Sequence, residues 1–359
     1  LNTSPAWLSK PASLLYVSNR DGGRDLYQVP LSRSGKPAGE PVRLTTGLNA
    51  ATVSISADGR RLVYAAFNRT TNVWSIGVPQ SGSLPVERAE PVTTGNQEIE
   101  AFDISADGRW LIFDSDRGGT QQLYRMPLQG GEVEQLTNGD EPSMAPSLSR
   151  DGREIAYHTF RNGIRQLFVL PAEGGTPVQV THDSFQNRMA FWFPDGRSIA
   201  FVRNAVLPGA ATRMVTRDEN GRWSAPRVLL DGGDLAVPSP DGRSVLTITR
   251  DGDFVIVPVS GGPPRRVLSG RHTSPARGYI WAWSSDGRFV YYTGKDPANK
   301  VFGIWRVSAA GGVPQLAVSF DDPSRYLVRP WMRIHGNRIY FSRSDQQSDV
   351  WMTEIQGER

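Results

Sequence analysis

The sequence of 359 residues contains no cysteine and only four histidines. Without cysteine the chain can form neither a disulfide bond nor a thiolate metal site, and the absence fits an oxidising compartment in which a stray thiol is a hazard. The histidines, His158, His182, His272 and His335, are dispersed along the chain. A zinc site needs several such ligands to converge, so neither a metal site nor another cofactor is predicted.

Long apolar runs and blocks of one charge are missing too. The longest apolar stretches have the length of a strand, so no membrane span or signal peptide is visible and direct membrane insertion is not expected. The formal net charge is +4, and the basic residues are scattered instead of forming the clusters that bind nucleic-acid phosphates. Nucleic-acid binding is therefore not predicted, and the positive charge is attributed to solubility.

Common catalytic motifs are also absent. The sequence has no Gly-x-Ser-x-Gly elbow of a fused hydrolase. The glycine pairs, such as Gly130-Gly131, are interpreted as hairpin turns and not as phosphate-binding loops. Carboxylate pairs such as Glu98 with Glu100 could act as acid and base, but paired surface carboxylates are common, and no catalytic residue is assigned.

The sequence does contain a repeat. A tight turn reading Asp-Gly-Arg recurs roughly every 45 residues, a period typical of a propeller blade. Intact copies begin at Asp58, Asp107, Asp151, Asp195, Asp241 and Asp286. Degenerate copies at residues 10–12 and 336–338 precede similar apolar segments. Eight repeats are therefore predicted.

Each repeat is predicted to form four short strands, A to D. Residues 101–137, the third repeat, alternate apolar and polar positions and are rich in β-branched and aromatic residues. Asp107-Gly108 connects strand A to B, and Gly130-Gly131 connects C to D, because Asp and Gly accept the positive φ of tight hairpins. No comparable pattern predicts a long amphipathic helix.

These observations predict an all-β protein, a single eight-bladed β-propeller of four-stranded antiparallel blades, with seven blades as the alternative. One domain is expected over residues 1–359, since the repeats leave no stretch for a second. The expected blades span approximately residues 4–45, 52–94, 100–137, 143–181, 188–230, 234–268, 278–318 and 326–355. The last of these lacks a fourth strand. Because a propeller closes by pairing its last blade with its first, the natural chain is expected to extend upstream of Leu1.

Several motifs recur in the repeats: Ser/Ala-x-Asp-Gly-Arg, Leu-x-Tyr/Phe, Ser-x-Arg-x-Gly, Leu-Tyr/Trp-x-x-Pro, Gly-Gly and Leu-Thr. The third repeat matches well, with Phe-Asp-Ser-Asp-Arg-Gly at 113–118 and Leu-Tyr-Arg-Met-Pro at 123–127. Over almost the whole chain the pattern resembles the TolB-like or PD40 repeats, a branch of WD40-like β-propellers. Similar repeats occur in periplasmic translocation proteins, in extracellular sensor halves of bacterial kinases and transcription regulators, and in gating domains of prolyl-oligopeptidase-like enzymes. The resemblance implies the fold and assigns no function by itself.

The loops between strands B and C carry one basic residue in most repeats. In a propeller these loops share a face with the D–A loops, the usual mouth for ligands. The basic residues are Arg20, Arg69, Arg117, Arg161, Arg203, Arg250 and Lys295. A structural interpretation, in which each cation bridges to the adjacent blade, is favoured; the alternative is a basic rim that attracts anionic partners.

The D–A loops differ between repeats, and a specific site is expected where a uniform scaffold varies. Acidic residues concentrate in the third and fourth repeats, and basic or aromatic residues in the fifth, seventh and eighth. The predicted ligand-binding residues at the channel mouth are Glu100, Asp140, Glu141, Arg188, Asp234, Arg277, Tyr279, Arg325 and Arg329. The two arcs of opposite charge predict a ligand with opposite charges at its ends, such as a peptide with free termini; simple pairing of neighbouring side chains in solvent is the alternative.

Aromatic residues divide into core and mouth positions. Expected to pack between blades from strand A are Trp7, Trp192, Trp281, Trp283 and Trp331. Phe185 and Tyr279 lie nearer the mouth and are better candidates for ligand contact. Two insertions, residues 204–211 and 295–300, lie on the same predicted face.

The sequence thus predicts a ligand- or protein-binding propeller, the extracytoplasmic sensing or interaction part of a larger bacterial protein in the periplasm or outside the cell. Its partner is expected to be a protein or a small molecule at the channel mouth. The alternative is an enzyme of the lyase, lactonase or glycosidase type that acts in the channel. An enzyme should concentrate unpaired carboxylates or histidines at the ends of strand A, whereas a binding module should place its variable residues on the rim.

Overall fold

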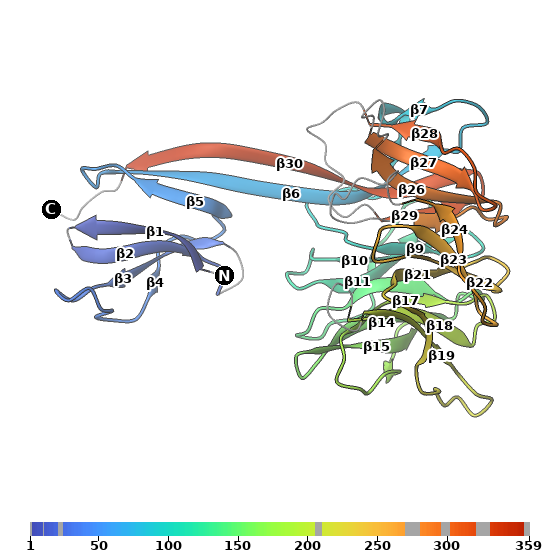
Figure 1. Ribbon diagram of the computed structural model, residues 1–359. Helices are drawn as coiled ribbons and strands as arrows, with labels where there is room; N and C mark the ends of the chain where they lie inside the picture. The colour runs from blue at the N-terminus through green and yellow to red at the C-terminus, as the bar shows by residue number, and fades with distance from the viewer. Residues whose placement is uncertain are drawn as a thin grey trace. The chain divides into compact units, whose positions relative to one another are not determined.

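The protein is built from β-strands that form two separate units. The computed structural model describes residues 2–9, 11–20, 24–204, 210–269, 281–295, 302–320 and 331–354. Apart from one short 3-10 helix, η1 (Val86–Arg88), the regular elements in these ranges are strands (Figure 1), which confirms the all-β prediction. One unit comprises Leu1–Arg69 with Asp345–Arg359, and the other comprises Thr70–Ser344. Each unit is described by itself below, and the single domain expected over residues 1–359 stays a prediction.

The second unit contains six sheets in its described residues, which we call blades I to VI. Blade I consists of β9 (Phe102–Ile104), β10 (Trp110–Ser115), β11 (Gln122–Pro127) and β12 (Glu134–Gln135). Blade II consists of β13 (Met144–Leu148), β14 (Glu154–Arg161), β15 (Ile164–Pro171) and β16 (Val178–Gln179). Blade III consists of β17 (Asn187–Trp192), β18 (Ser198–Arg203), β19 (Ala211–Thr216) and β20 (Arg227–Asp231).

The remaining three blades follow the same order from the centre outward. Blade IV consists of β21 (Asp234–Pro238), β22 (Ser244–Ile248), β23 (Phe254–Pro258) and β24 (Arg265–Leu268). Blade V consists of β25 (Trp281–Trp283), β26 (Phe289–Lys295), β27 (Phe302–Ser308) and β28 (Gln315–Ser319), with β7 (Leu84–Pro85) added parallel to β28. Blade VI consists of β29 (Met332–His335), β30 (Arg338–Glu354), β6 (Arg61–Gly77) and β8 (Glu90–Pro91).

The innermost strands close a ring. Strands β9, β13, β17, β21, β25 and β29 contact one another in this order, and β29 contacts β9. Blade VI joins the two ends of this unit: Val78 N donates to Asn337 O at 2.9 Å, and Thr71 Oγ1 lies 2.7 Å from Ser344 Oγ, so β6 and β30 run antiparallel. Pairing the first segment of the unit with its last completes the closing blade, as in other propellers.

The predicted blade count of eight is not confirmed, since the described part of the second unit contains six blades. In the second and eighth repeats the expected strands B and C are single continuous strands, β6 and β30. Residues 67–72 and 344–349, which would have to turn, contain neither glycine nor proline. In the third and fourth repeats the corresponding turns use Gly119 (φ 101°) and Gly163 (φ 75°), a conformation that glycine accepts at low cost. The sequence of both long strands therefore favours extended chain over a hairpin.

The first unit, taken by itself, contains the sheet of the first repeat. Its strands are β1 (Asn2–Ser9), β2 (Ala12–Ser18), β3 (Asp25–Pro30) and β4 (Val42–Arg43), and β5 (Ala50–Ile55) pairs with the start of β6. Trp7 is 68% exposed, so its predicted burial is wrong. Ala6 and Leu8 pack against the core of this unit, and Trp7 between them lies on the opposite face of the strand, because successive side chains alternate.

The other four strand-A tryptophans are buried, as predicted. In three of them the indole N–H also donates to a backbone carbonyl of the neighbouring blade. The pairs are Trp281 with Leu246 at 3.4 Å, Trp283 with Val237 at 3.1 Å and Trp331 with Phe102 at 2.6 Å. Each of these side chains therefore joins blades both by packing and by a hydrogen bond.

The Asp-Gly-Arg turns form as expected. In blade I, Ser105 Oγ donates to Asp107 Oδ1 at 2.6 Å, and Gly108 has a φ of 70°. The hydrogen bonds from Ser105 and from Arg109 hold the pKa of Asp107 well below its usual range. Because the strands alternate in direction, these turns lie on one face of each blade, the turn face, and the B–C and D–A connections lie on the other, the mouth face.

Candidate functional site

In the described blades I to IV, the residue seven positions before the turn aspartate lies at the mouth end of the innermost strand. In blades I to IV these residues are Glu100, Met144, Arg188 and Asp234. In blades II to IV the next residue has a positive φ, at Ala145 (53°), Met189 (55°) and Leu235 (40°), and the strand register shifts there. Positive φ is uncommon outside glycine, so this repeated bulge is a shared device that interrupts regular pairing at the mouth end of strand A.

The structure describes five of the nine predicted ligand-binding residues. These are Glu100, Asp140, Glu141, Arg188 and Asp234. The other four, Arg277, Tyr279, Arg325 and Arg329, lie outside the described residues. Arg188 and Asp234, on adjacent blades, approach each other, with 3.9 Å between Arg188 Nη2 and Asp234 Oδ1. This separation is too long for a hydrogen bond, so the two charges face each other without a close contact.

On the acidic side, the buried carboxyl of Asp114 joins blades I and II. Its oxygens accept the backbone N–H groups of Glu100 (2.8 Å), Ala101 (2.8 Å) and Ala145 (2.9 Å). Burial raises the pKa of Asp114 to about 7 against the effect of these donors, and the charge of Glu100 adds to the rise. Asp114 therefore holds the backbone at Glu100 in place. Asp140 and Glu141 lie in the following loop and are exposed.

Three of the seven basic residues of the B–C segments stack on an aromatic ring of strand C. The distances from guanidinium carbon to ring centroid are 5.4 Å for Arg20 on Tyr27, 5.4 Å for Arg117 on Tyr124 and 5.8 Å for Arg161 on Phe168. The rings belong to the Leu-Tyr or Leu-Phe pair of strand C, so two recurring motifs make one cation–π contact. This agrees with a structural role for these arginines, although the partner is a ring of the same blade and not a carboxylate of the next.

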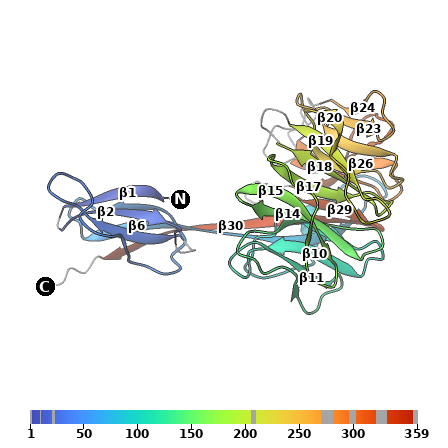
Figure 2. The ribbon, with the colours of Figure 1, turned by 90° about the horizontal axis from the view of Figure 1, so that it is seen from below.

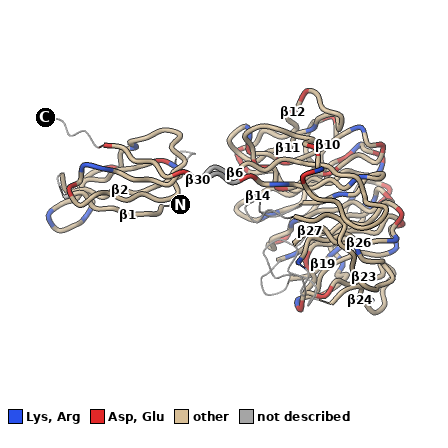
Figure 3. The backbone as a smooth tube through the Cα atoms, turned by 90° about the horizontal axis from the view of Figure 1, so that it is seen from above, with Lys and Arg blue, Asp and Glu red and all other residues tan. Residues whose placement is uncertain are grey.

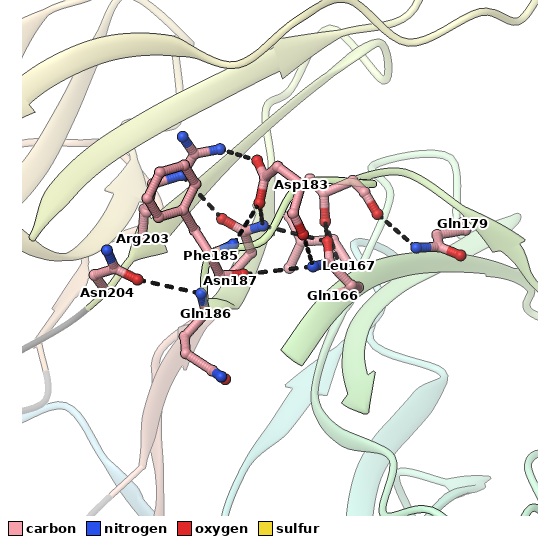
Figure 4. Close-up of polar contacts among 10 residues, drawn as sticks. Gln166, Leu167, Gln179, Asp183, Phe185, Gln186, Asn187, Arg203 and Asn204 are labelled. Atoms are coloured by element: carbon pink, nitrogen blue, oxygen red, sulfur yellow. Dashed lines mark hydrogen bonds and ion pairs between the residues drawn. The ribbon is translucent and has the colours of Figure 1, made fainter. Parts of the chain in front are cut away.

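Arg203 belongs to a network of polar contacts near the mouth (Figure 4). Its side chain is 8% exposed, and its guanidinium forms an ion pair with Asp183 and lies 4.4 Å from the ring centroid of Phe185. Its Nε donates to Asn187 Oδ1 at 3.3 Å, and Asn187 in turn donates to Gln166 Oε1 at 3.3 Å. Burial lowers the pKa of Arg203 and the charge of Asp183 opposes the shift. The network ties blade II to blade III.

Beside this network, a second group of charges lies between blades II and III, where β14 and β17 pack together (Figure 2). His158 on β14 is 3% exposed. Burial lowers its pKa to about 3, and the positive charges of Arg165 and Arg188 lower it as well. His158 Nδ1 and Arg188 Nε are buried and have no hydrogen-bond partner among the described residues.

The centre of the ring is filled at the level of strand A. Phe191 of blade III and Trp331 of blade VI, which stand opposite each other in the ring, are stacked with centroids 5.9 Å apart and planes 13° apart. The guanidinium of Arg333 lies 5.1 Å from the centroid of Phe191, and its Nε donates to Asp103 at 2.8 Å. These side chains close the centre below the mouth register.

A cavity of about 500 Å³ opens on the turn face, between blades I and II. Trp110, Leu148 and charged residues of both turns line it. The most enclosed of these, Arg125, stacks on Trp110 at 5.0 Å and forms an ion pair with Glu173 at 2.9 Å. Because this guanidinium already has its partners, the cavity offers a ligand less than the mouth does.

Other kinds of site receive no support from the described ranges. Within them, no group of three or more His, Cys, Asp or Glu side chains could hold a metal ion. The same residues include no helix with the length and apolar character needed to cross a membrane. In the view of Figure 3, Lys and Arg are interspersed with Asp and Glu over the loops of the second unit.

Sequence reasoning missed the network around Arg203, although a signal was present. The recurring Thr of the Leu-Thr motif accepts a backbone N–H of strand C and donates to the polar side chain one residue before that N–H. This occurs with Thr45 and Asp25, Thr93 and Asn72, Thr137 and Gln122, and Thr181 and Gln166. The motif therefore marks the anchor of the D–A loop, and Gln166 is the member that reaches Asn187.

Comparison with known proteins concerns the fold. No protein-family model matches the chain. A putative TolB from Agrobacterium tumefaciens is 19% identical with a TM-score of 0.59, over 77% of this chain and 99% of that chain. TolB from Acinetobacter baumannii is 14% identical with a TM-score of 0.51, over 84% of this chain and 81% of that chain. A chain of a nidogen/laminin complex is 12% identical with a TM-score of 0.50, over 70% and 97%. The propeller expected from the repeats is thereby confirmed.

Proposed function

We propose that this chain, a β-propeller of the TolB-like fold, is a binding module that holds a charged ligand or a protein segment at its mouth face. The main support for this proposal is that equivalent positions in the four blades differ in charge and polarity. These positions are Glu100, Met144, Arg188 and Asp234. Side chains that vary on a uniform scaffold are the usual basis of a specific site. Below them the stacked side chains at the ring centre give the module a filled interior.

The mouth supplies charges of both signs for such a ligand. Asp140 and Glu141 are exposed and form no ion pair with a described residue. On the basic side, Arg188 Nη2 lies 3.9 Å from Asp234 Oδ1. A ligand with opposite charges at its ends, such as a peptide with both termini free, would satisfy both sides.

The setting we propose is the periplasm or the exterior of a bacterial cell, where the module would be the sensing or interaction part of a larger protein. The absence of cysteine supports this setting, as does the resemblance of the repeats to those of periplasmic and extracellular proteins. A protein partner agrees with the occurrence of a similar chain in a complex of two proteins. The alternative of a channel enzyme is less supported, because the carboxyl with the raised pKa, Asp114, is enclosed by backbone donors.

The proposal is tested with a panel of hexapeptides of random sequence that carry free, N-acetylated or C-amidated ends, titrated against the protein by isothermal calorimetry. Peptides with both ends free should bind best, and Asp140→Asn with Glu141→Gln should weaken them by about 1–3 kcal/mol, the range of charge-assisted contacts. The matched control is Asp151→Asn on the turn face. Equal binding of all three panels, or an equal effect of the control, would refute the proposal.

A further inference from the structure

We infer that the first unit is an interface for a second copy of this chain, and that two first units pair to close a four-bladed ring. The inference goes beyond the proposed function, because it concerns the first unit and not the mouth face. It follows from a comparison of the first unit with the junction of blades II and III, where a strand-A tryptophan and the surface that receives it are both buried.

The junction of blades II and III shows how a strand-A tryptophan is covered. Trp192 of blade III packs in one cluster with three aliphatic side chains of blade II, which are Ala156 on β14 and Leu167 and Val169 on β15. Ala156 and Val169 stand opposite each other in the sheet. Leu167 is 0% exposed and Val169 is 4% exposed. The tryptophan and this aliphatic surface therefore shield each other from water.

The first unit contains both halves of such a junction, and both are open. Trp7 occupies the strand-A position of Trp192 but is 68% exposed. The three aliphatic positions, counted from the turn aspartate in strand B and from the aromatic residue in strand C, are occupied by Val63, Val350 and Met352. Val350 is 76% exposed, Met352 is 65% exposed and Val63 is half-buried. The first unit thus exposes a tryptophan and the kind of surface that covers a tryptophan elsewhere in the chain.

The aliphatic surface is assembled from two repeats. The sheet order places β30 beside β6 and β6 beside β5, so the end of β30 takes the position of strand C (Figure 1). The two contacts that join β6 to β30 in blade VI share one antiparallel register. Continued along both strands, this register sets Met352 opposite Val63, as Val169 stands opposite Ala156 in blade II. The surface therefore repeats the layout of the one that covers Trp192.

The two open surfaces cannot cover each other within one chain. The neighbours of Trp7 in β1 and those of Val63 in β6 pack in the core between the two sheets of the unit. Because successive side chains of a strand point to opposite faces, Trp7 and Val63 are directed away from this core. They belong to different sheets, so they lie on the two outer faces of the pair of sheets.

A second copy supplies what each surface lacks. The tryptophan of one copy fits the aliphatic surface of the other, and a two-fold axis repeats the contact. Each of the four sheets then has a neighbour on both sides, and four is the smallest number of blades common in propellers. The blades of the second unit already contact their neighbours around a closed ring, so the partner surface is that of another first unit.

The size of the contact indicates an association that depends on concentration. A buried aromatic side chain covers about 150–250 Å², and each contact adds two exposed aliphatic side chains. The two contacts together therefore cover on the order of 1,000 Å², which is at the lower end for a specific interface. We expect a dimer that forms at micromolar concentrations and dissociates on dilution.

The test measures the mass of the full chain by sedimentation velocity over a series of protein concentrations. The parent should change from monomer to dimer as the concentration rises, and no larger species should form because the ring is closed. Trp7→Glu and Val350→Lys should each weaken the association at least tenfold, since either places a charge in an apolar contact. In dilute solution, where the chain is a monomer, both variants should unfold like the parent, which excludes damage to the fold.

The matched control is Val313→Lys, because Val313 belongs to the second unit and is 88% exposed. This variant should dimerise like the parent. The inference is overturned by a parent that stays monomeric at every concentration, by association that Trp7→Glu does not weaken, or by an equal loss in Val313→Lys.

A mixture of the two first-unit variants tests which surfaces meet. Each contact uses Trp7 of one copy and Val350 of the other, so neither variant alone forms an intact contact. In the mixed dimer one contact is native and the other sets the introduced Glu against the introduced Lys. The mixture should therefore associate at least tenfold more tightly than either variant alone. A mixture that associates no better than its components would show that like surfaces meet, and the four-bladed ring would be wrong.

Discussion

The two units bury some equivalent positions of the repeat to very different extents. The Leu that precedes the strand-C ring is buried at Leu123 (0%) and Leu167 (0%) in the second unit and at Leu26 (3%) in the first, whereas its counterpart Val350, also in the first unit, is 76% exposed. On strand A, Trp192 is 7% exposed and Trp7 is 68% exposed. The residues are equally apolar, so burial depends on the presence of a neighbouring blade and not on residue type.

Contacts within a blade, in contrast, are the same in both units. The guanidinium of Arg20 lies 5.4 Å from the ring centroid of Tyr27 in the first unit, and Arg117 lies 5.4 Å from Tyr124 in the second. The Thr anchor of strand D is also present in both, at Thr45 and at Thr137. The local sequence of one repeat is therefore sufficient for its internal contacts, whereas contacts between sheets need strands of a second repeat.

The largest expected difference between the units is at tryptophan. Trp192→Ala should lower the free energy of unfolding by about 3–5 kcal/mol, because it leaves a void between blades II and III. Trp7→Ala, the same change at the same position of the first repeat, should lie within about 0.5 kcal/mol of the parent. Denaturant unfolding followed by circular dichroism measures both. Equal losses would show that Trp7 is covered in solution.

Closure through the long strands is tested by disulfide bonds in a chain that has no other cysteine. Thr71→Cys with Ser344→Cys should form a bridge, since the two hydroxyl oxygens are 2.7 Å apart, and should stabilise the ring by roughly 2–4 kcal/mol. Mobility in a non-reducing gel and the free energy of unfolding report the result.

The control pair is Val63→Cys with Ser75→Cys. A hairpin like that of β10 and β11, in which Ile112 faces Arg125, would bring these two residues together. In the continuous strand β6 they are separated by about 40 Å of extended chain. A bridge between Cys at 63 and 75 would restore the eight-bladed prediction and contradict the ring of six.

The sequence was sufficient for what is local and periodic. The Asp-Gly-Arg turns, the alternation of strand residues and the packing tryptophans of the second unit followed from spacing and residue type. The blade count did not follow, because the repeats at 10–12 and 336–338 look alike whether their strands turn back or continue. The lack of glycine in residues 67–72 was visible, but its consequence depends on which distant strand is available as a partner.

The candidate site shows the same division. That Arg188 and Asp234 stand at one register could be predicted from the distance to each turn aspartate. That Arg188 faces His158 across a blade junction, while Arg203 receives Asp183, depends on side-chain directions between blades. Spacing along the sequence carries no information on those directions.

Asp114 offers a pH-dependent test of contacts between blades. Its folded pKa of about 7 lies above the unfolded value of about 4, so the folded state holds the proton more tightly. The contribution of Asp114 to stability is thus complete below about pH 4 and is lost as the pH rises to about 7, by at most about 1.4 kcal/mol per pH unit.

The variant Asp114→Asn tests this prediction, because its side chain does not titrate and has one acceptor fewer for the three backbone donors. In urea unfolding, the free energy of unfolding of the parent should exceed that of this variant most at pH 5 and least at pH 8. A difference that grows with pH would mean that Asp114 is ionised in the folded protein.

The smallest effect is expected for the contact that both units share. Arg20→Ala in the first unit and Arg161→Ala in the second each remove a guanidinium from the face of a strand-C ring, Tyr27 or Phe168. Each substitution should cost about 0.5–1 kcal/mol, the range of exposed cation–π contacts, because neither contact depends on a neighbouring blade. Lys at either position should recover part of the loss, whereas Gln should not, since the interaction needs a cation.

Native-state hydrogen exchange at the amides of strand C measures the local stability of each unit separately. A loss at Arg161 several times that at Arg20 would show that the ring, and not the repeat alone, sustains this contact, and the distinction between local and inter-blade contacts would fail.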